Sequence, residues 1–339
     1  MTLFNRAPGV EWTEDGPSTV PLVTPQARAD AFPPACGACG GELGIDGYCL
    51  QCGQKARNLR EHYELAPVPW LAGVCDIGLA HPHNEDALAA HAEADRAVIV
   101  VCDGVTTSDD SDVASIAGAH AAADRLWASN PQGTGTPGSR AAAMAAVLAE
   151  AVAAANQAVI GATDPHSLNS AAATLAIAVI DAGMLYCANL GDSRVYWLPV
   201  DGEPVLATKD HSLAQAGIES GTGRAEAESS VFAHTITKWL GRDAIDLEPY
   251  TATVDIGAGG WVLVCSDGLW NYASEPSALG ALVTRFTTDD ATPPHLVAAL
   301  AAWANEQGGH DNITVACAWV APPGPPADEP TVTAPISSD

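Results

Sequence analysis

The sequence predicts an α+β fold in which antiparallel sheets lie between helices. Short runs rich in Val and Ile recur through the middle of the chain, and most of them follow one another as hairpins. Two long Ala-rich segments fall together between the second and third of these runs. A parallel sheet would need a helix after nearly every strand, so this order favours antiparallel sheets with helices outside.

The individual elements are predicted from composition and from the residues that end each run. Eight apolar runs are predicted as strands: Leu71–Asp76, Ala97–Cys102, Thr174–Ile180, Met184–Asn189, Arg194–Leu198, Tyr250–Asp255, Trp261–Cys265 and Ile313–Val320. Three Ala-rich runs bounded by Asp, Pro, Gly or Asn are predicted as helices: Asp112–Ala128, Gly138–Ile160 and His295–Glu306.

Changes in composition divide the 339 residues into five segments. Residues 1–35, rich in Pro, Thr and charge, are predicted to be a flexible leader, and residues 36–53 hold two Cys pairs. Residues 54–67 are predicted to be a linker and residues 68–321 the main domain. The Pro-rich residues 322–339 are predicted to be a disordered tail.

Charge and hydropathy restrict the classes of function. With 41 acidic and 14 basic residues the chain has a formal net charge of −27, which would repel nucleic acid. No run approaches the roughly 20 uninterrupted apolar residues of a membrane span, and no signal segment opens the chain, so a cytoplasmic protein is predicted. Five cysteines in apolar runs are expected to be buried and reduced, without disulfides: Cys75, Cys102, Cys187, Cys265 and Cys317.

The other four cysteines form a doubled motif. Cys36 and Cys39 make one CxxC, and Cys49 and Cys52 make a second after nine intervening residues. Four thiolates at this spacing can close a tetrahedral zinc site, and the glycine after each pair permits the backbone turn toward them. Buried apolar cysteines or a redox pair are the alternatives, but the segment has too few apolar residues for a core, and one CxxC suffices for redox chemistry. A structural Zn²⁺ is therefore predicted.

Acidic residues stand at the ends of several apolar runs. Asp103 and Asp267 each end a run and are followed by Gly, and Asp311 lies just before the last run. Hard divalent cations prefer oxygen ligands, and two cations about 3.5–4 Å apart need a bridging carboxylate. A single Asp-Gly pair is more often a hairpin turn. Two such pairs, with the strings NED and HDN nearby, favour a metal centre instead.

Six strings carry a resemblance to a known family: CDIGLAHPHNEDA, VIVVCDGV, ANLGDSRVY, KDHS, VLVCSDGLW and GGHDNITV. In this order, from about Asp76 to Val320, they resemble the motifs of the PPM-type, or type 2C, metal-dependent serine/threonine protein phosphatases. The resemblance implies a four-layer α-β-β-α sandwich of two antiparallel sheets flanked by helices. The cysteine segment lies outside this match and resembles the zinc ribbons attached to some bacterial members.

The resemblance also implies the ligands of a two-metal centre for Mn²⁺ or Mg²⁺. Asp103 corresponds to the bridging aspartate and Gly104 to a carbonyl ligand, because a residue without a side chain lets its carbonyl approach an ion. Asp267 and Asp311 correspond to the remaining direct ligands. In such enzymes the cations lower the pKa of a water molecule toward neutrality, so that hydroxide attacks the phosphorus directly.

Further positions have supporting roles in the family. Glu85 and Asp86 correspond to acidic residues that hold metal-bound waters, and Asn312 and Thr174 to residues that line or support the site. Asp192, together with the second Asp-Gly aspartate, corresponds to a third, weaker metal site of bacterial relatives.

The sequence departs from the family beside the predicted phosphate. Many members carry an Arg four residues before the Glu of NED, where this chain has His81. A histidine cannot form the same bidentate fork, so phosphate affinity is expected to be weaker or supplied by His83 or Arg194. A solvated loop histidine without a role is the alternative. Val105 replaces a histidine that eukaryotic members place after Asp-Gly.

The polar stretch Gln215–Phe232 corresponds to the flap beside the active site of bacterial relatives. It is predicted to be a mobile specificity element, with a plain surface loop as the alternative.

Two functions remain open from the sequence. The first is a phosphatase for phosphoserine and phosphothreonine in proteins, opposing a bacterial serine/threonine kinase and binding two or three Mn²⁺ or Mg²⁺ ions. The alternative is a weakly active or inactive phosphoprotein-binding scaffold that recruits partners through its zinc ribbon. Its weakness is that several carboxylates converging without cations would repel one another. A nucleic-acid or membrane partner is not expected.

Overall fold

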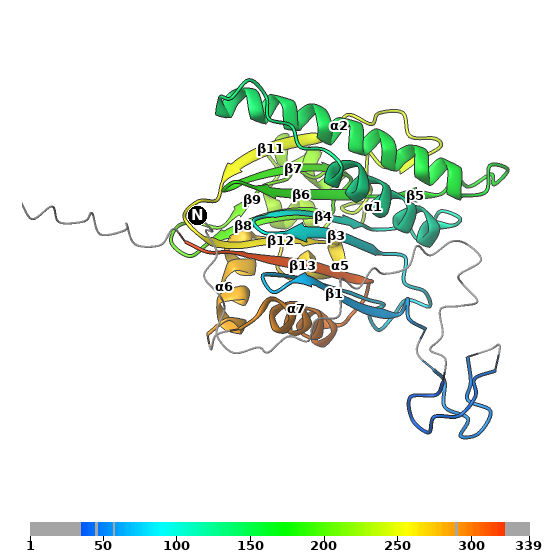
Figure 1. Cartoon of the computed structure of the whole chain (residues 1–339). Coiled ribbons are helices and arrows are strands. Elements are labelled where there is room, and N and C mark those ends of the chain that lie inside the picture. Colours follow the sequence, from blue (N-terminus) through cyan, green and yellow to red (C-terminus); the bar gives the residue numbers. More distant parts are fainter. Residues whose placement is uncertain (1–34, 45–46, 57, 289–290, 323–339) are drawn as a thin grey trace, which may run out of the picture.

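A computed structural model describes residues 35–44, 47–56, 58–288 and 291–322 of the chain. The predicted leader and tail therefore lie, apart from Ala35 and Pro322, outside the described residues. Two antiparallel sheets with helices outside them form the main domain (Figure 1).

The first sheet has six strands, and every neighbouring pair in it is antiparallel. Its strands in spatial order are β1 (His62–Val68), β2 (Leu71–Asp76), β13 (Ile313–Val320), β12 (Gly260–Cys265), β8 (Arg194–Pro199) and β9 (Val205–Leu206). The central strands are rich in Val, Ile and Cys and are almost wholly buried, as expected for strands covered on both faces.

The second sheet has five strands and is also antiparallel throughout. Its strands in spatial order are β11 (Tyr250–Asp255), β7 (Met184–Leu190), β6 (Leu175–Asp181), β4 (Arg96–Cys102) and β3 (Ala87–Glu93). Two short strands, β5 (Ala172–Ala173) and β10 (Leu240–Gly241), pair with each other and form a separate small sheet.

Three hydrophobic clusters account for the layers. One joins the facing sides of the two sheets, with Leu71 and Val264 from the first and Ile99 and Ala176 from the second. A second packs α1 (Ser111–Trp127) and α2 (Pro137–Ala162) on the outer face of the five-stranded sheet. The third packs α5 (Asp267–Trp270), α6 (Pro276–Phe286) and α7 (Pro293–Gln307) on the outer face of the six-stranded sheet. The layers thus run helix, sheet, sheet, helix, as Figure 1 shows.

All eight predicted strands and all three predicted helices are present, with ends that differ by a few residues. β1 and β3, which are an edge strand and an Ala-rich strand with weak β propensity, were not predicted. Neither were the helix α6 and the short elements β5, β9, β10 and α5. The predicted linker 54–67 is therefore wrong for residues 62–67, because β1 pairs with β2 and packs Tyr63 and Leu65 on the inter-sheet core.

Among the described residues, α2 alone is long and apolar enough to pass for a membrane span by length and composition. This segment was not predicted to be a candidate span, because Arg140 and Glu150 interrupt its apolar run. One face of α2 packs on the sheet and on α1 through Met144 and Leu148. The Asn156 side chain on the same helix accepts a buried hydrogen bond from the Gly241 backbone (2.8 Å). These contacts are those of a core helix.

The stretch predicted as a flap is partly helical. It contains most of α3 (Leu213–Glu219) and all of α4 (Arg224–Glu228), and Ser212 caps α3 by accepting a hydrogen bond from Gln215 N (3.2 Å). The alternative of a plain surface loop is therefore wrong, since α4 is tied to the domain by the ion pairs described below.

Candidate active site

Strand register brings the predicted acidic residues to one end of the sandwich. In the five-stranded sheet, Ala87 pairs with Cys102, so Asp86 and Asp103 leave β3 and β4 side by side. In the six-stranded sheet, Cys265 pairs with Val315, so Asp267 and Asp311 lie at neighbouring strand ends. The turn between β7 and β8 adds Asp192. Residues more than 200 positions apart thus meet because antiparallel strands share their ends.

Asp103 is fixed by its backbone. Its N–H donates to Thr174 Oγ1 (3.0 Å), and its carbonyl accepts from Thr174 N (2.7 Å). The Gly104 that follows lies against the backbone carbonyls of Glu85 and Ser111, which a Cβ atom would approach to 2.6 and 2.7 Å. Only glycine fits there, so the Asp-Gly pair is required by packing as well as by any ligand role.

Asp267 opens the short helix α5 directly after β12, and Asp311 precedes β13. Asn271 Nδ2 donates to Asp267 Oδ2 (3.1 Å), while Asp267 Oδ1 is buried and has no hydrogen-bond partner among the described residues. The next residue, Gly268, again packs on backbone, since a Cβ there would lie 2.0 Å from the Asn312 carbonyl.

Asp86 is the most buried of these carboxylates, with 1% of its surface exposed. Its Oδ2 accepts a hydrogen bond from Ser266 Oγ (2.7 Å), and that same hydroxyl accepts from Thr314 N (3.0 Å). The Asp86 side chain is therefore held by Ser266, which directly precedes Asp267 and is itself bonded to the start of β13.

The carboxylates perturb one another. Burial, followed by the charges of Asp86 and Asp267, raises the pKa of Asp103 well above its usual range. Burial and the Asp267 charge likewise raise the pKa of Asp192 and bring that of Asp311 to about 6. Such mutual repulsion is the expected result of gathering carboxylates without a cation between them.

These residues fit divalent cations. Oxygen donors converge from both sheets, they destabilise one another's charged forms, and Asp267 Oδ1 lacks a hydrogen-bond partner within the described part of the chain. Hard cations such as Mg²⁺ and Mn²⁺ take this donor set.

Glu85 and Asn312 organise the loop beside the cluster. Asn312 Oδ1 accepts from Glu85 N (2.7 Å), and its Nδ2 donates to the carbonyls of Ile77 (2.8 Å) and His83 (3.1 Å). The amide of Asn312 thus holds this loop in place beside the cluster. The Glu85 carboxylate accepts hydrogen bonds from Thr106 Oγ1 (2.8 Å) and from the Ser111 hydroxyl.

His81 lies between two acidic groups of the cluster. Its Nε2 is 3.3 Å from Asp311 Oδ1, and its Nδ1 is 3.7 Å from Glu85 Oε2. His81 is therefore in contact with the acidic cluster and is not a freely solvated loop residue. His83, the first proposed substitute for the missing arginine, is exposed, and its carbonyl accepts from Asn312.

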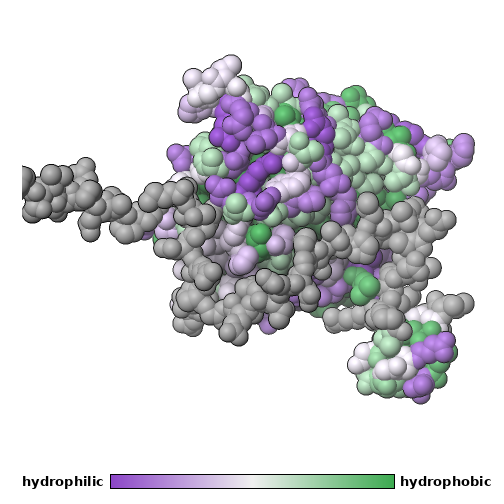
Figure 2. All heavy atoms as spheres, in the orientation of Figure 1, coloured by the Kyte–Doolittle hydropathy of each residue, from purple (hydrophilic) through white to green (hydrophobic). Residues whose placement is uncertain are grey.

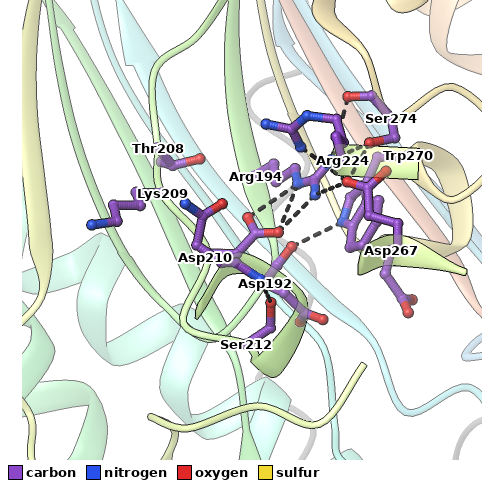
Figure 3. A network of polar contacts seen from close by, with 12 residues as sticks. Asp192, Arg194, Thr208, Lys209, Asp210, Ser212, Arg224, Asp267, Trp270 and Ser274 are labelled. Atoms are coloured by element: carbon purple, nitrogen blue, oxygen red, sulfur yellow. Dashed lines mark hydrogen bonds and ion pairs between the residues drawn. The ribbon is translucent and has the colours of Figure 1, made fainter. Parts of the chain in front are cut away.

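Arg194 cannot replace the missing arginine either. It is 1% exposed, and its guanidinium binds the Asp210 carboxylate through Nε (3.0 and 3.1 Å) and Nη2 (2.7 Å). Nη2 also reaches Glu228 Oε1 (3.2 Å) on α4, and the guanidinium carbon lies 3.6 Å from the centre of the Trp270 ring. Figure 3 shows this network beside Asp192 and Asp267. Arg194 therefore ties the flap helix to the domain.

Some contacts of the site were not predicted. Arg60 Nη2 donates to the carbonyls of Asn84 (3.1 Å) and Asp86 (2.8 Å), and so connects the start of β1 to the NED string. His234, at the end of the flap stretch, lies with its Nδ1 3.6 Å from Asp267 Oδ2. Neither residue stands in a recognisable motif, so only the folded chain reveals it.

A pocket of about 270 Å³ opens beside the acidic cluster. Its lining includes Asp311 and Gly268 from the cluster and the side chains of Trp270, Tyr272 and His310. It is therefore in a position to receive groups attached to a molecule bound at the carboxylates.

The four N-terminal cysteines come together as predicted. Their Sγ atoms all lie within 4.8 Å of one another, with Cys36–Cys52 at 3.6 Å and Cys39–Cys49 at 3.5 Å. Backbone hydrogen bonds from Cys52 and Gln51 lower the pKa of Cys49 to about 6. Although a backbone hydrogen bond from Gly41 acts in the opposite direction, the thiols of Cys52 and Cys49 raise the pKa of Cys39 to about 12.

The quartet fits a tetrahedral Zn²⁺ site. A Zn–S bond of about 2.3 Å gives a tetrahedron with S···S edges of about 3.8 Å, close to the observed separations. Gly40 and Gly53, one after each CxxC, have φ values of +72° and +71°, the conformation predicted from the sequence. The other five cysteines are free and buried, as predicted.

A comparison with known protein families decides which family the main domain represents. The family model described as protein phosphatase 2C matches residues 80–305, more than half of the chain. The chain belongs to the protein phosphatase 2C family. The matched residues include the NED, Asp-Gly and GDSR strings, which supply the carboxylates described above except Asp311.

Individual relatives of this protein phosphatase 2C member are bacterial. Protein phosphatase PhpP of Streptococcus pneumoniae is 33% identical over 141 residues, which are 41% of this chain and 54% of PhpP. The chain thus spans about half the length of the curated relatives it matches.

The serine/threonine phosphatase PstP/Ppp of Mycobacterium tuberculosis has a similar structure, with a TM-score of 0.59 and 26% identity over 74% of this chain and 97% of that one. The fold is also that of the S. agalactiae serine/threonine phosphatase, with a TM-score of 0.61, 23% identity, and coverage of 76% of this chain and 100% of that one.

Proposed function

We propose that the chain hydrolyses phosphoserine and phosphothreonine in proteins and opposes a bacterial serine/threonine kinase in the cytoplasm. The observation that carries this proposal is the convergence of Asp103, Asp267 and Asp311, where burial and neighbouring carboxylates raise the pKa of Asp103 and Asp311 and a cation would offset the repulsion. The relatives named as serine/threonine phosphatases support the same reaction.

Asp103, Gly104, Asp267 and Asp311 would hold two Mn²⁺ or Mg²⁺ ions, which supply a water molecule of lowered pKa and neutralise phosphate charge. Glu85 and Asp86 are held by Ser111 and Ser266 beside these ligands, where carboxylates can orient water. His81 lies at Asp311 and is the residue we propose to contact the phosphate.

The pocket of about 270 Å³ next to Asp311 gives the substrate a place. Because its walls include the aromatic rings of Trp270 and Tyr272, we propose that it receives a side chain flanking the phosphorylated residue. The formal charge of −27 fits a protein partner better than nucleic acid.

We propose one structural Zn²⁺ bound by Cys36, Cys39, Cys49 and Cys52. The ribbon leaves Tyr48 (48%) and Leu50 (69%) exposed, and Figure 2 shows hydrophilic and hydrophobic side chains side by side on it. None of its described residues belongs to the acidic cluster, and we propose that it stabilises the segment or serves as an adaptor for a partner.

The test uses the full chain with a phosphothreonine peptide and p-nitrophenyl phosphate, with Mn²⁺ and with EDTA. We expect turnover only with the metal, and a loss of at least about 10³-fold in Asp103→Asn and Asp267→Asn. Asp95→Asn, on the exposed β3–β4 turn at the opposite end of β4, is the matched control and should keep full activity.

The scaffold alternative makes the opposite prediction. It requires the wild type to bind the phosphopeptide in calorimetry without releasing phosphate at any metal concentration. Turnover that persists in EDTA would also refute the proposed mechanism.

A further inference from the structure

His234, which was not among the predicted ligands, lies beside two of them. Its imidazole Nδ1, a carboxylate oxygen of Asp192 and one of Asp267 all lie within 4.8 Å of one another. Asp192 and Asp267 were expected to form a weak third metal site from oxygen donors alone. A nitrogen donor beside them was not expected.

The position of His234 is defined by its neighbours. Its ring stacks on Trp270, with 5.8 Å between ring centroids and an interplanar angle of 30°. The indole Nε1 of Trp270 donates to the Asp192 carbonyl (2.8 Å), so one aromatic side chain contacts both the histidine and the backbone of the aspartate. Figure 3 shows this contact between Trp270 and Asp192, with Asp267 close to both.

The backbone on either side of His234 is also held. Ala233 N donates to Ser230 O (2.9 Å), and Leu213 N donates to Thr235 O (3.0 Å). The imidazole is therefore presented by a segment bonded to the rest of the flap, although half of the side chain is exposed to solvent.

Asp267 also offers a buried carboxylate oxygen that no described side chain or backbone group satisfies. Asp267 is 9% exposed, and its Oδ1 has no hydrogen-bond partner among the described residues. An unpaired buried carboxylate oxygen is costly unless a cation or donor meets it. The 3.6 Å between His234 Nδ1 and Asp267 Oδ2 suits two ligands of one ion, since ligand bonds of about 2.0–2.2 Å place neighbouring ligands about 3–4 Å apart.

We propose that His234, Asp192 and Asp267 form a mixed nitrogen–oxygen site for Mn²⁺. Imidazole favours transition metals, whereas Mg²⁺ prefers oxygen ligands and retains its waters, so His234 gives this site a preference against Mg²⁺. The inference extends the proposed phosphatase function, because Asp267 is shared with the two-metal centre.

The test is Mn²⁺ binding to the full chain after its ribbon has been loaded with Zn²⁺, followed by electron paramagnetic resonance. Free Mn²⁺ gives the stoichiometry, and pulsed spectra detect ¹⁴N coupled to bound Mn²⁺. We expect ¹⁴N coupling in the wild type, its loss in His234→Asn, and Mn²⁺ affinity at one site at least about tenfold weaker in that variant. Competition by Mg²⁺ at that site should become more effective.

His81→Asn is the matched control, because His81 lies beside Asp311 and is the other histidine near the cluster. Retention of the ¹⁴N signal in His81→Asn supports the assignment. Absence of the signal in the wild type, its persistence in His234→Asn, or its loss only in His81→Asn overturns it. The spectra measure metal binding without substrate. A wild type that fails to hydrolyse phosphopeptide would therefore refute the proposed function, while the ¹⁴N coupling would still show whether His234 binds Mn²⁺.

Discussion

The guanidinium of Arg194 lies 3.6 Å from the centre of the Trp270 ring while it binds Asp210 through two nitrogens. All three side chains are buried. The pair thus connects the helix that begins with Asp267 to the DHS string and, through Glu228, to the flap helix α4.

Replacing Arg194 should therefore cost stability. In Arg194→Met, the Asp210 carboxylate stays buried without its partner, which typically costs about 3–5 kcal/mol. Urea denaturation measures the loss, and the double variant Arg194→Met/Asp210→Leu should recover much of it. Arg125→Met, whose partner Glu150 is exposed, is the control and should cost less than about 1 kcal/mol. Equal losses in the two single variants would contradict the role given to Arg194.

Removing one charge from the acidic cluster should stabilise the metal-free protein. Burial and neighbouring carboxylates raise the pKa of Asp103, so its ionised form opposes folding at pH 7. In EDTA, Asp103→Asn should melt at least about 2 °C above the wild type. With Mn²⁺ the order should reverse, because only the wild type binds the cations fully. A lower melting temperature in EDTA would count against the convergence of charges.

An arginine at position 81 should improve substrate binding. His81 lies at Asp311, where a guanidinium can meet two phosphate oxygens that an imidazole cannot. We expect the KM of His81→Arg for a phosphothreonine peptide to fall about fivefold to tenfold. The control is His83→Arg, which adds the same charge to an exposed neighbour. An equal change in both variants would indicate a general effect of charge.

The stability of the protein should depend on His211 in mildly acidic solution. Burial, aided by Lys238, lowers the pKa of His211 from 6.5 to about 4. A group whose pKa is lower in the folded state stabilises that state above the unfolded pKa, and this contribution is lost as pH falls from 6.5 toward 4.

The free energy of unfolding should accordingly fall more in the wild type than in His211→Gln between pH 7.5 and 5. The difference should be about 1 kcal/mol, because partial exposure screens the effect. His166→Gln, at an exposed turn, should follow the wild type. Parallel pH profiles for wild type and His211→Gln would rule out this contribution.

Zn²⁺ should bind to the ribbon and should not be required for turnover. Metal analysis of the purified chain should give about one Zn²⁺ per molecule, and Cys49→Ser should lose it while still hydrolysing p-nitrophenyl phosphate. Cys187→Ala, a change inside the sheet, should retain the metal. Zinc retained by Cys49→Ser would exclude the quartet as its site.

The sequence was sufficient to predict the strand-end carboxylates. Asp103 and Asp267 follow long apolar runs, so each was expected at the end of a strand. Antiparallel pairing brings neighbouring strand ends together, and this places the predicted acidic residues at one end of the two sheets.

Contacts that depend on tertiary placement were not predictable. Arg194 was taken for an available cation, because its partners Asp210 and Glu228 lie 16 and 34 residues further along the chain. His234 approaches Asp267 from the segment that follows α4, where its ring stacks on Trp270. β1 was missed because an edge strand is half-buried and shows little of the apolar alternation by which strands are recognised.

The few residues between the ribbon and the main domain set how far apart the two can move. Ala56, whose N–H donates to Gly47 O of the ribbon, and Arg60, whose guanidinium binds the Asp86 carbonyl, are four residues apart, a span of at most about 14 Å. A protein that bound the ribbon would therefore be held near the acidic loop by a short connection. Its effective concentration there would be in the millimolar range, on the order expected for short linkers.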